Sequence, residues 1–446
     1  MRNTQDCGPC SFGSFLAFAE QEVAQHQASL LWTGVTGAAS RSFLFSRPNS
    51  RLTISDRSAD PWSELIASCN SDPTDPFPRW LLACTYEMGV SAQNTDPLPL
   101  PSTLAVLTGF EEVWIYHHAT KRLLRVADDP VERVWRAPPP LEWARIQPKV
   151  TESLQRESRA YWERLLSNDD AEACYQGSVR QLREEILDGL FYQLNLTHEV
   201  HLPPVEHPWD CFLQMQSQQK GAMGAYVQIP EHTLMSVSPE RLLRRRGTQL
   251  TTAPIKGTLL RQRGSCIDSF RALTNNPKEL SELRMIIDLM RNDLGRVAIP
   301  GTVRVPRLFS IMALRHLHHL YGIVQAEVHH DLHPIEALKA VFPGGSISGC
   351  PKKSAMAAIS RYEGRVRGWY TGAVAHVAPN GDMDSNLLIR TAVAASNSTS
   401  LAFGSGIVLR SQPRAEWSET LAKGRPIGEI LLQNILRSKQ SAECLV

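Results

Sequence analysis

The sequence has almost no net charge with which to attract a polyanion. Its 47 basic side chains nearly cancel 45 acidic ones, so the formal net charge is +2 over 446 residues. Nucleic acids and anionic membranes are held largely by broad fields of positive charge, and this composition offers none. Any anionic ligand therefore has to be held by a local site.

Long hydrophobic runs are absent as well. No stretch approaches the roughly 20 apolar residues that cross a membrane. The first residues, MRNTQDCGPC, also lack the apolar core of a signal peptide. Internal repeats and low-complexity tails are missing too. We therefore expect a cytoplasmic globular protein, with no membrane segment and no nucleic acid partner.

Cysteines are few and irregularly spaced. Nine of them, an odd number without framework spacing, are typical of a reducing compartment. Cys7 and Cys10 have the spacing of a redox dithiol, but that chemistry needs the pair at a helix start after a buried strand, and only six residues precede Cys7. We expect a frayed terminus here rather than a redox centre. No second Cys or His pair completes a zinc site.

Helical and strand-like segments follow one another along the chain. Residues 151–190 have helical patterning, whereas 191–202, 224–229 and 232–238 alternate as strands do. Proline-rich breaks at 96–102 and 137–143 predict turns and a connection. The order predicts a mixed helix and strand architecture in which an N-terminal portion, 1–150, and a second portion, 151–436, pack as one large unit.

Two helix starts each carry a pair of glutamates. In "NNPKELSELRMIIDLMRNDLGRV", Asn276 is a good N-cap, and Glu279 and Glu282 lie three positions apart on one helix face. Capping and the helix dipole would explain that pair alone. However, "SQPRAEWSETLAK" repeats the arrangement with Glu416 and Glu419. Two such pairs form a plausible cage for Mg²⁺, which takes one or two carboxylates with waters and an anionic substrate.

Two glycine-rich segments are candidate anion sites. In "FPGGSISGCPKKSAMAAISRYEG", backbone N–H groups can crowd around an anion at the start of the helix that Pro351 opens. Cys350 and Pro351 replace the Lys-Ser/Thr of a P-loop, so a carboxylate is a better guess than a triphosphate. "FGSGIV" at 403–408 is predicted to be a second glycine turn.

Three further polar residues stand in apolar surroundings. Arg390 ends an apparent strand, and either a substrate carboxylate or an internal salt bridge could pair with it. His319 has no carboxylate spacing typical of a metal ligand and is interpreted as a polar residue near a strand. Lys256 lies in the stiff frame Pro-Ile-Lys-Gly-Thr, although a lone lysine is usually a solvated surface residue.

Ordered motifs over residues 160–430 carry a resemblance. The segments "YQLNL", "SPERLL", "PIKGT", "KELSELRMIIDLMRNDLGRV", "FPGGSISGCPK", "GWYTGAVAHV", "MDSNLLIRT", "GSGIV" and "EWSETLAK" occur in that order. With them the sequence resembles the chorismate-utilising enzymes, the family of the anthranilate, aminodeoxychorismate, isochorismate and salicylate synthases. The resemblance implies an α+β fold like that of anthranilate synthase component I, with two packed β-sheets flanked by helices.

The resemblance also implies roles for residues at matching positions. Glu282 and Glu419 would bind Mg²⁺ directly, and Glu279 and Glu416 through water. Glu240 would protonate the departing C4 hydroxyl of chorismate, and His319 would lie beside the ring. Tyr370 and Arg390 would hold the pyruvyl carboxylate. The full substrate-binding set that this implies is Gln193, Thr258, Ser346, Tyr370, Arg390, Gly406 and Lys423.

Two positions separate the branches of the family. Isochorismate and salicylate synthases have a water-activating lysine where this chain has Gln193, and anthranilate synthases usually have alanine where it has Lys256. Lys256 resembles the nucleophile of aminodeoxychorismate synthases, which would attack C2 before ammonia enters at C4. The resemblance therefore implies the p-aminobenzoate and folate branch. Because no glutaminase triad is evident, we expect free ammonia or a separate glutamine amidotransferase subunit.

Two alternatives stay open. The chain could be an anthranilate synthase component I, or a non-catalytic scaffold that binds a glutaminase. It departs from the family pattern at Gly322, Arg410 and Leu190, where serine and two aspartates are usual. The family's tryptophan-sensing signature is missing, so the resemblance does not imply feedback inhibition by tryptophan.

Overall fold

A computed structural model describes most of the chain, namely residues 2–32, 40–93, 100–129, 135–166, 169–219, 223–260, 271, 275, 277–313 and 317–443. The helices of these ranges are α1 (Phe12–His26), α2 (Pro61–Ala67), α3 (Met88–Gln93), α4 (Trp143–Ile146), α5 (Glu152–Leu166), α6 (Asp169–Leu187), α7 (Pro208–Gln218), α9 (Pro277–Gly295), α10 (Pro334–Val341), α11 (Lys352–Glu363) and α12 (Pro413–Glu443). None of these helices combines the length and the apolar character needed to cross a membrane.

The strands of the described ranges are joined by hydrogen bonds in one network of 19. They are β1 (Asn3–Pro9), β2 (Ser29–Trp32), β3 (Arg41–Ser55), β4 (Trp80–Cys84), β5 (Thr103–His117), β6 (Arg122–Ala127), β7 (Gln193–Leu202), β8 (Met223–Ile229), β9 (His232–Ser238), β10 (Arg241–Arg246), β11 (Gln249–Ala253), β12 (Ile255–Leu260), β13 (Arg304–Ala313), β14 (Leu317–Glu327), β15 (Gly349–Cys350), β16 (Ala373–Val377), β17 (Met383–Leu387), β18 (Thr391–Ala394) and β19 (Thr399–Val408).

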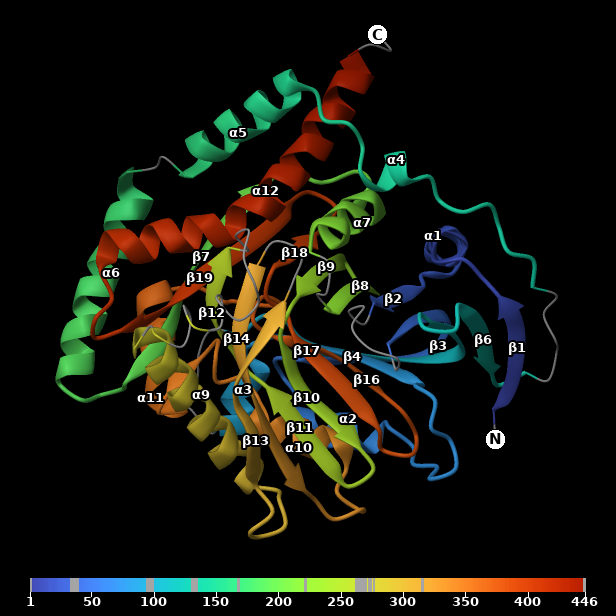
Figure 1. Cartoon of the computed structure of the whole chain (residues 1–446), viewed down its shortest axis with the longest axis horizontal. Coiled ribbons are helices and arrows are strands. Elements are labelled where there is room, and N and C mark those ends of the chain that lie inside the picture. Colours follow the sequence, from blue (N-terminus) through green and yellow to red (C-terminus); the bar gives the residue numbers. More distant parts are fainter. Residues whose placement is uncertain are drawn as a thin grey trace.

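Strand pairing ties the N-terminal third to the rest of the chain. β4 pairs antiparallel with β16, and β2 pairs antiparallel with β8. Figure 1 shows the blue N-terminal strands continuing into the orange and green strands of the later segments. The backbone groups of the two portions thus satisfy one another, as buried strand edges require.

The core has a sheet-on-sheet layer and outer helical layers. One buried cluster is built almost wholly from strand side chains of β2 to β6, β8, β9 and β16, including Phe45, Phe110 and Leu234. A second cluster places α1, α7 and α12 on the other face, with Phe15, Phe212 and Leu431 among its members. These two layers agree with the predicted α+β fold of packed sheets flanked by helices.

Most of the elements expected from patterning are present. The helical segment 151–190 forms α5 and α6, and the three predicted strands form β7, β8 and β9. The two glutamate-bearing segments both open helices, α9 and α12. The last of these is a single helix of 31 residues, which crosses the molecule beside α5 and α6 (Figure 1). The predicted N-cap, Asn276, lies outside the described residues.

The "FGSGIV" segment is a strand rather than the predicted glycine turn. It lies inside β19, which pairs antiparallel with β7 over ten consecutive residues, from Thr399–Leu202 to Val408–Gln193. A side chain on Gly404 would collide with the carbonyl oxygen of Leu196. The glycine there serves the close approach of two strands and not a reversal of the chain.

The N-terminus is also ordered, contrary to the expected fraying. β1 pairs antiparallel with β6, although its own sequence lacks the apolar alternation of a strand. Burial raises the pKa of the Cys7 thiol to about 11 and raises that of Cys10 as well. Reactive cysteines need a lowered pKa, so these raised pKa values give no support to a redox role for Cys7 and Cys10.

A buried ion pair fixes α9 against α11. Lys352 Nζ lies 2.7 Å from Asp293 Oδ2, and both side chains are almost fully buried. We expect Asp293→Asn to lower the free energy of unfolding by about 3–5 kcal/mol, because it leaves a buried ammonium without its carboxylate. Urea denaturation measures this. The double variant Asp293→Leu/Lys352→Met removes both charges and should recover most of the loss, and a double variant as unstable as the single one would contradict the explanation.

Candidate active site

Lys256 points into the interior from a bulged strand. It lies on β12 opposite Leu320 of β14, and the pairing shifts register at Gly257, whose φ of 68° is left-handed. Glycine tolerates this backbone at low cost, which explains the residue after the lysine in the Pro-Ile-Lys-Gly-Thr frame. The Lys256 side chain is only 15% exposed, and its Nζ lies 3.8 Å from Oε2 of Glu282. It is therefore not the solvated surface lysine that it would be by default.

Two other predicted residues meet Lys256. Gln193 and Gly406 lie on the paired strands β7 and β19. A β-carbon built on Gly406 would be 2.9 Å from Nε2 of Gln193 and 3.1 Å from Nζ of Lys256. The Gln193 side chain is fully buried, and neither of its polar atoms has a hydrogen-bond partner within the described part of the chain. Buried polar groups are rarely left unpaired, so this amide is available to a ligand.

Glu240 lies close to the lysine in a dry environment. It sits between β9 and β10, and Ser346 of the glycine-rich loop donates a hydrogen bond of 2.6 Å to its Oε1. Burial raises the pKa of Glu240 to about 7, although the Ser346 hydrogen bond and the charge of Lys256 act to lower it. The carboxyl group can thus hold a proton near neutral pH, as a general acid must.

Tyr370 and Arg390 also lie near each other. Arg390 was predicted to end a strand; instead it occupies the short link between β17 and β18 with a left-handed φ of 51°. Its Nη1 donates to Oε1 of Gln219 at 2.7 Å, and burial lowers the pKa of its guanidinium to about 10 while Tyr370 opposes that change. No acidic residue of the described ranges pairs with it, which favours a ligand carboxylate over an internal salt bridge.

His319 lies on β14 behind the bulge. Its Nδ1 is 3.4 Å from the carbonyl oxygen of Gly257. Burial lowers the pKa of His319 to about 3, and the nearby charges of Arg390 and Lys423 lower it further. The imidazole is therefore neutral at pH 7 and lies within the electrostatic reach of the proposed carboxylate-binding groups.

Arg367, which the sequence did not single out, joins several segments that carry residues of this site. Its guanidinium is buried, pairs with Glu363 at 2.7 Å, and donates to the carbonyl oxygens of Ile347 and Asn195. It thereby joins the glycine-rich loop, β7 and the segment that carries Tyr370. Glu363 ends α11 and Arg367 lies beyond its left-handed C-cap, Gly364, so helical spacing does not explain the pair and the local sequence has no signal for it.

The four glutamates differ in their surroundings. Glu282 and Glu416 are buried and Glu279 is partly buried, whereas Glu419 is half-exposed and pairs with Lys423 at 2.8 Å. Lys423 also donates to the carbonyl oxygen of Gly404 at 3.1 Å. Over the described ranges, no three His, Cys, Asp or Glu side chains converge as a metal-binding group. The magnesium site remains a prediction, and so does a role for Thr258, whose side chain lies outside the described residues.

One departure from the family pattern has a packing explanation. At Gly322 of β14, a β-carbon would collide with Cδ1 of Ile287 on α9. The isoleucine side chain occupies the space that a serine would need. The substitution therefore alters how α9 packs on β14 without removing any of the polar groups described above.

A comparison with protein families shows to which family the chain belongs. A family profile described as chorismate binding enzyme matches residues 27–429. The chain belongs to this family. The matched region includes every residue of the candidate site.

Curated relatives have names within the same group of enzymes. Aminodeoxychorismate synthase component 1 of Klebsiella aerogenes is 32% identical over 386 residues, which are 83% of each chain. The protein of the same name from Escherichia coli is 38% identical over 251 residues, or 56% of this chain and 55% of that relative. Anthranilate synthase component 1 of Geobacillus stearothermophilus is 34% identical over 279 residues, or 62% and 55%.

Solved structures show the same fold. Anthranilate synthase component I of Streptococcus pneumoniae superposes with a TM-score of 0.70 at 22% identity, covering 88% of this chain and 93% of that one. MenF, an isochorismate synthase of Escherichia coli, superposes with a TM-score of 0.68 at 17% identity, covering 97% and 95%. These likenesses confirm the predicted fold class.

Proposed function

We propose that the chain aminates chorismate at C4 to give 4-amino-4-deoxychorismate, a step toward p-aminobenzoate and folate. The observation that carries the proposal is the position of Lys256, whose Nζ lies beside Gln193, Gly406 and Glu282 in the interior. The names of the relatives from Klebsiella and Escherichia support it.

Lys256 acts as the first nucleophile in this proposal. Its free amine forms a bond to C2 of chorismate while the ring double bond shifts and the C4–O bond breaks. Glu240 donates its proton to the departing oxygen, which leaves as water. Ammonia then forms a bond to C4, the C2–N bond breaks, and the lysine amine is released. The proton shed by the new amino group returns to Glu240, so the sum is chorismate plus ammonia giving product plus water.

Neighbouring residues orient the substrate. Arg390 and Tyr370 bind the pyruvyl carboxylate, and neutral His319 lies beside the ring. The unpaired amide of Gln193 binds a polar group near C2. Because glutamine cannot act as a base as lysine does, attack of water at C2 is disfavoured here, and the amine of Lys256 takes that position.

Mg²⁺ is the cofactor of the proposal. The donor set of Glu279, Glu282, Glu416 and Glu419 consists of carboxylates alone, which suits this hard cation. When bound, the ion would neutralise a carboxylate of chorismate. A separate glutamine amidotransferase subunit would supply the ammonia, in agreement with the component 1 names of the relatives.

The product of the reaction tests the proposal. Purified protein is incubated with chorismate, Mg²⁺ and ammonium, and the products are separated with and without an added aminodeoxychorismate lyase. We expect 4-amino-4-deoxychorismate alone and p-aminobenzoate when the lyase is present. Anthranilate as the main product would assign the chain to the other branch, and no turnover would favour a non-catalytic glutaminase-binding scaffold.

A variant of the second glutamate pair tests the metal. We expect Glu419→Ala to raise the Mg²⁺ concentration needed for half-maximal activity by about tenfold or more, because it removes one carboxylate ligand. Glu429→Ala, farther along α12, is the matched control and should leave that concentration unchanged. A Mg²⁺ titration of the initial rate measures both. An unchanged response in Glu419→Ala would remove this residue from the site.

A further inference from the structure

Large apolar side chains are exposed where α6 ends and β7 begins. Leu187, Leu190 and Tyr192 are 66%, 53% and 64% exposed, and Leu409 is 44% exposed. Val408, the last residue of β19, pairs with Gln193, the first residue of β7; Leu409 and Tyr192 are the next residues beyond this pair. We call these four residues the α6–β7 patch. A cluster of this kind is unusual on a soluble monomer and marks a surface that another molecule covers.

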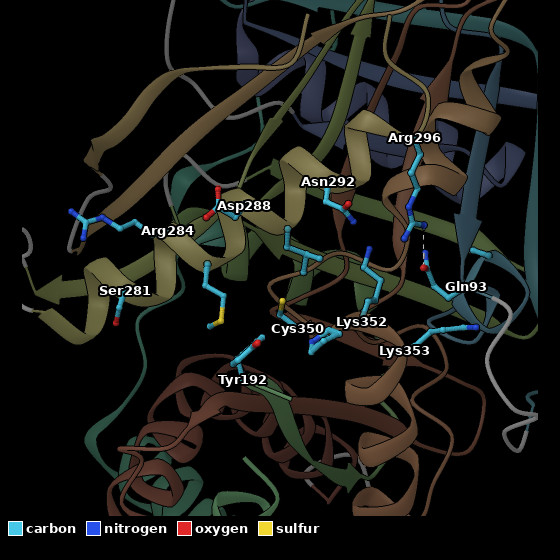
Figure 2. Close-up of a pocket in the computed structure, with 14 residues that line it drawn as sticks. Gln93, Tyr192, Ser281, Arg284, Asp288, Asn292, Arg296, Cys350, Lys352 and Lys353 are labelled. Carbon is cyan, nitrogen blue, oxygen red and sulfur yellow. Dashed lines mark hydrogen bonds between the residues drawn. The ribbon is translucent and has the colours of Figure 1, made fainter. Parts of the chain in front are cut away.

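A groove of about 1000 Å³ continues from this patch. Tyr192 belongs to both, and α9 forms the facing wall with Met285 and Leu289 in its middle. Figure 2 shows Arg284 on α9 and Arg296, just after the end of α9, at opposite ends of the groove, with Tyr192 across the groove from the helix and Lys353 at the same end as Gln93. A rise of 1.5 Å per residue puts Arg284 about 17 Å from Gly295, where α9 ends next to Arg296. That length suits a protein segment of about five extended residues better than a metabolite.

The groove carries excess positive charge. Arg284 and Lys353 have no acidic partner in the described part of the chain. At the Arg296 end of the groove, one carboxylate group, that of Asp293, pairs with two basic side chains. Lys352 lies 2.7 Å from it and Arg296 lies 3.9 Å from it. Asp288, the only acidic residue among the described residues that line the groove, already pairs with Arg291 at 2.8 Å. The complementary partner therefore presents carboxylates around an apolar centre.

The groove lies next to the candidate active site. Tyr192 lines the groove, whereas Gln193, the next residue, lies beside Lys256. Tyr192 directly precedes β7 and Gln193 begins it, so the two places meet at the start of this strand. On α9, Arg284 lines the groove and Glu282 contacts Lys256. A subunit that supplies ammonia and docks on this face would release it next to the residues of the candidate active site.

We propose that the α6–β7 patch and the groove behind it form the docking surface for the glutamine amidotransferase subunit, which would insert an acidic segment with an apolar centre. The inference rests on the proposed function, because that function requires an external source of ammonia. Tyrosine, methionine and arginine, which line the groove, are enriched in protein interfaces.

Two sets of variants test the surface. Leu187→Asp/Leu190→Asp places charge in the patch, and Arg284→Glu/Lys353→Glu reverses the charge of the groove. Arg57→Glu/Lys121→Glu is the matched control, because both residues are exposed and lie in the N-terminal third. Each full-length variant is mixed with the glutamine amidotransferase subunit of the same organism, and amination is measured with glutamine and, separately, with ammonium. Binding is measured in parallel by isothermal titration calorimetry.

We expect both test variants to bind the subunit at least about tenfold more weakly and to lose glutamine-dependent amination in proportion. Their ammonium-dependent rates should stay within about twofold of the parent chain, and the control should behave as the parent in all three measurements. Unchanged affinity and glutamine-dependent rate in both test variants would overturn the docking surface. If the parent chain shows no ammonium-dependent amination, the proposed function fails, and the calorimetric comparison alone decides the surface. Loss of self-association instead of subunit binding would assign the face to a second copy and overturn the proposal.

Discussion

Replacing Lys256 with alanine should lower the amination rate by roughly 10⁴-fold or more, the scale seen when a covalent nucleophile is removed. The reason is geometric as well as chemical. Nζ is the only amine placed beside Gln193 and Gly406 among the described residues, and the next lysine of the site, Lys423, pairs with Glu419 instead. Single-turnover mixing with chorismate, Mg²⁺ and ammonium, followed by separation of the products, measures the loss.

Substrate binding should survive this change. Arg390 and Tyr370 would still hold the pyruvyl carboxylate, so calorimetry should give chorismate affinity within about tenfold of the parent. Lys256→Arg is the companion variant, because it keeps a positive charge at this position but supplies no free amine. We expect it to be as inactive as the alanine variant. Turnover close to normal in either variant would disprove covalent catalysis by Lys256.

Glu240→Gln should lower the rate by about 10²- to 10⁴-fold, the usual contribution of a general acid. Hydroxide is a poor leaving group, and the glutamine amide can accept the Ser346 hydrogen bond but cannot donate a proton to the departing oxygen. Ser346→Ala is the matched control, since it removes the hydrogen bond and leaves the acid. Because that bond lowers the pKa of Glu240, its loss should raise this pKa. The fall in rate on the alkaline side of the pH profile should therefore move to higher pH.

The pH dependence of the parent chain follows from the same carboxyl group. The protonated form is present below its raised pKa of about 7 and is lost above it, so the rate should fall as the pH rises through 7. The stability of the folded protein should also fall as the pH rises. The unfolded chain releases this proton near the ordinary value of 4.5 while the folded chain keeps it, so the free energy of unfolding should decline between pH 4.5 and 7. Both trends should be weaker in Glu240→Gln; a rate profile of unchanged shape would exclude Glu240 as the acid.

The sequence points to the candidate residues of this site but not to how the fold brings them together. Lys256, Glu240 and the glutamate pairs stand in recognisable motifs, and helical spacing puts each glutamate pair on one face. However, Gln193, Lys256 and Gly406 come from three strands separated by long stretches of chain. Only the antiparallel register of β7 with β19, and the bulge at Gly257, bring them together. Registers of this kind depend on distant partners and cannot be inferred from local pattern.

The wrong predictions share a physical cause. "FGSGIV" has the glycines of a turn, and residues 3–9 lack the alternation of a strand, yet both segments pair with neighbouring strands. Tertiary hydrogen bonding outweighs local propensity, which spans only about 1 kcal/mol for strands. Arg367 was missed for a related reason, because its partners on β7 and the glycine-rich loop are far from it in sequence.

Arg390 is a position where the stability of the fold and the proposed binding of the substrate favour different residues. Its left-handed backbone, with a φ of 51°, is unfavourable for any residue except glycine, and burial lowers the pKa of its guanidinium to about 10 because the charge is poorly solvated. Selection for heat resistance alone would therefore tend to replace Arg390 with glycine, which suits this backbone and carries no charge. We expect thermostable variants obtained without a screen for chorismate binding to lose the residue.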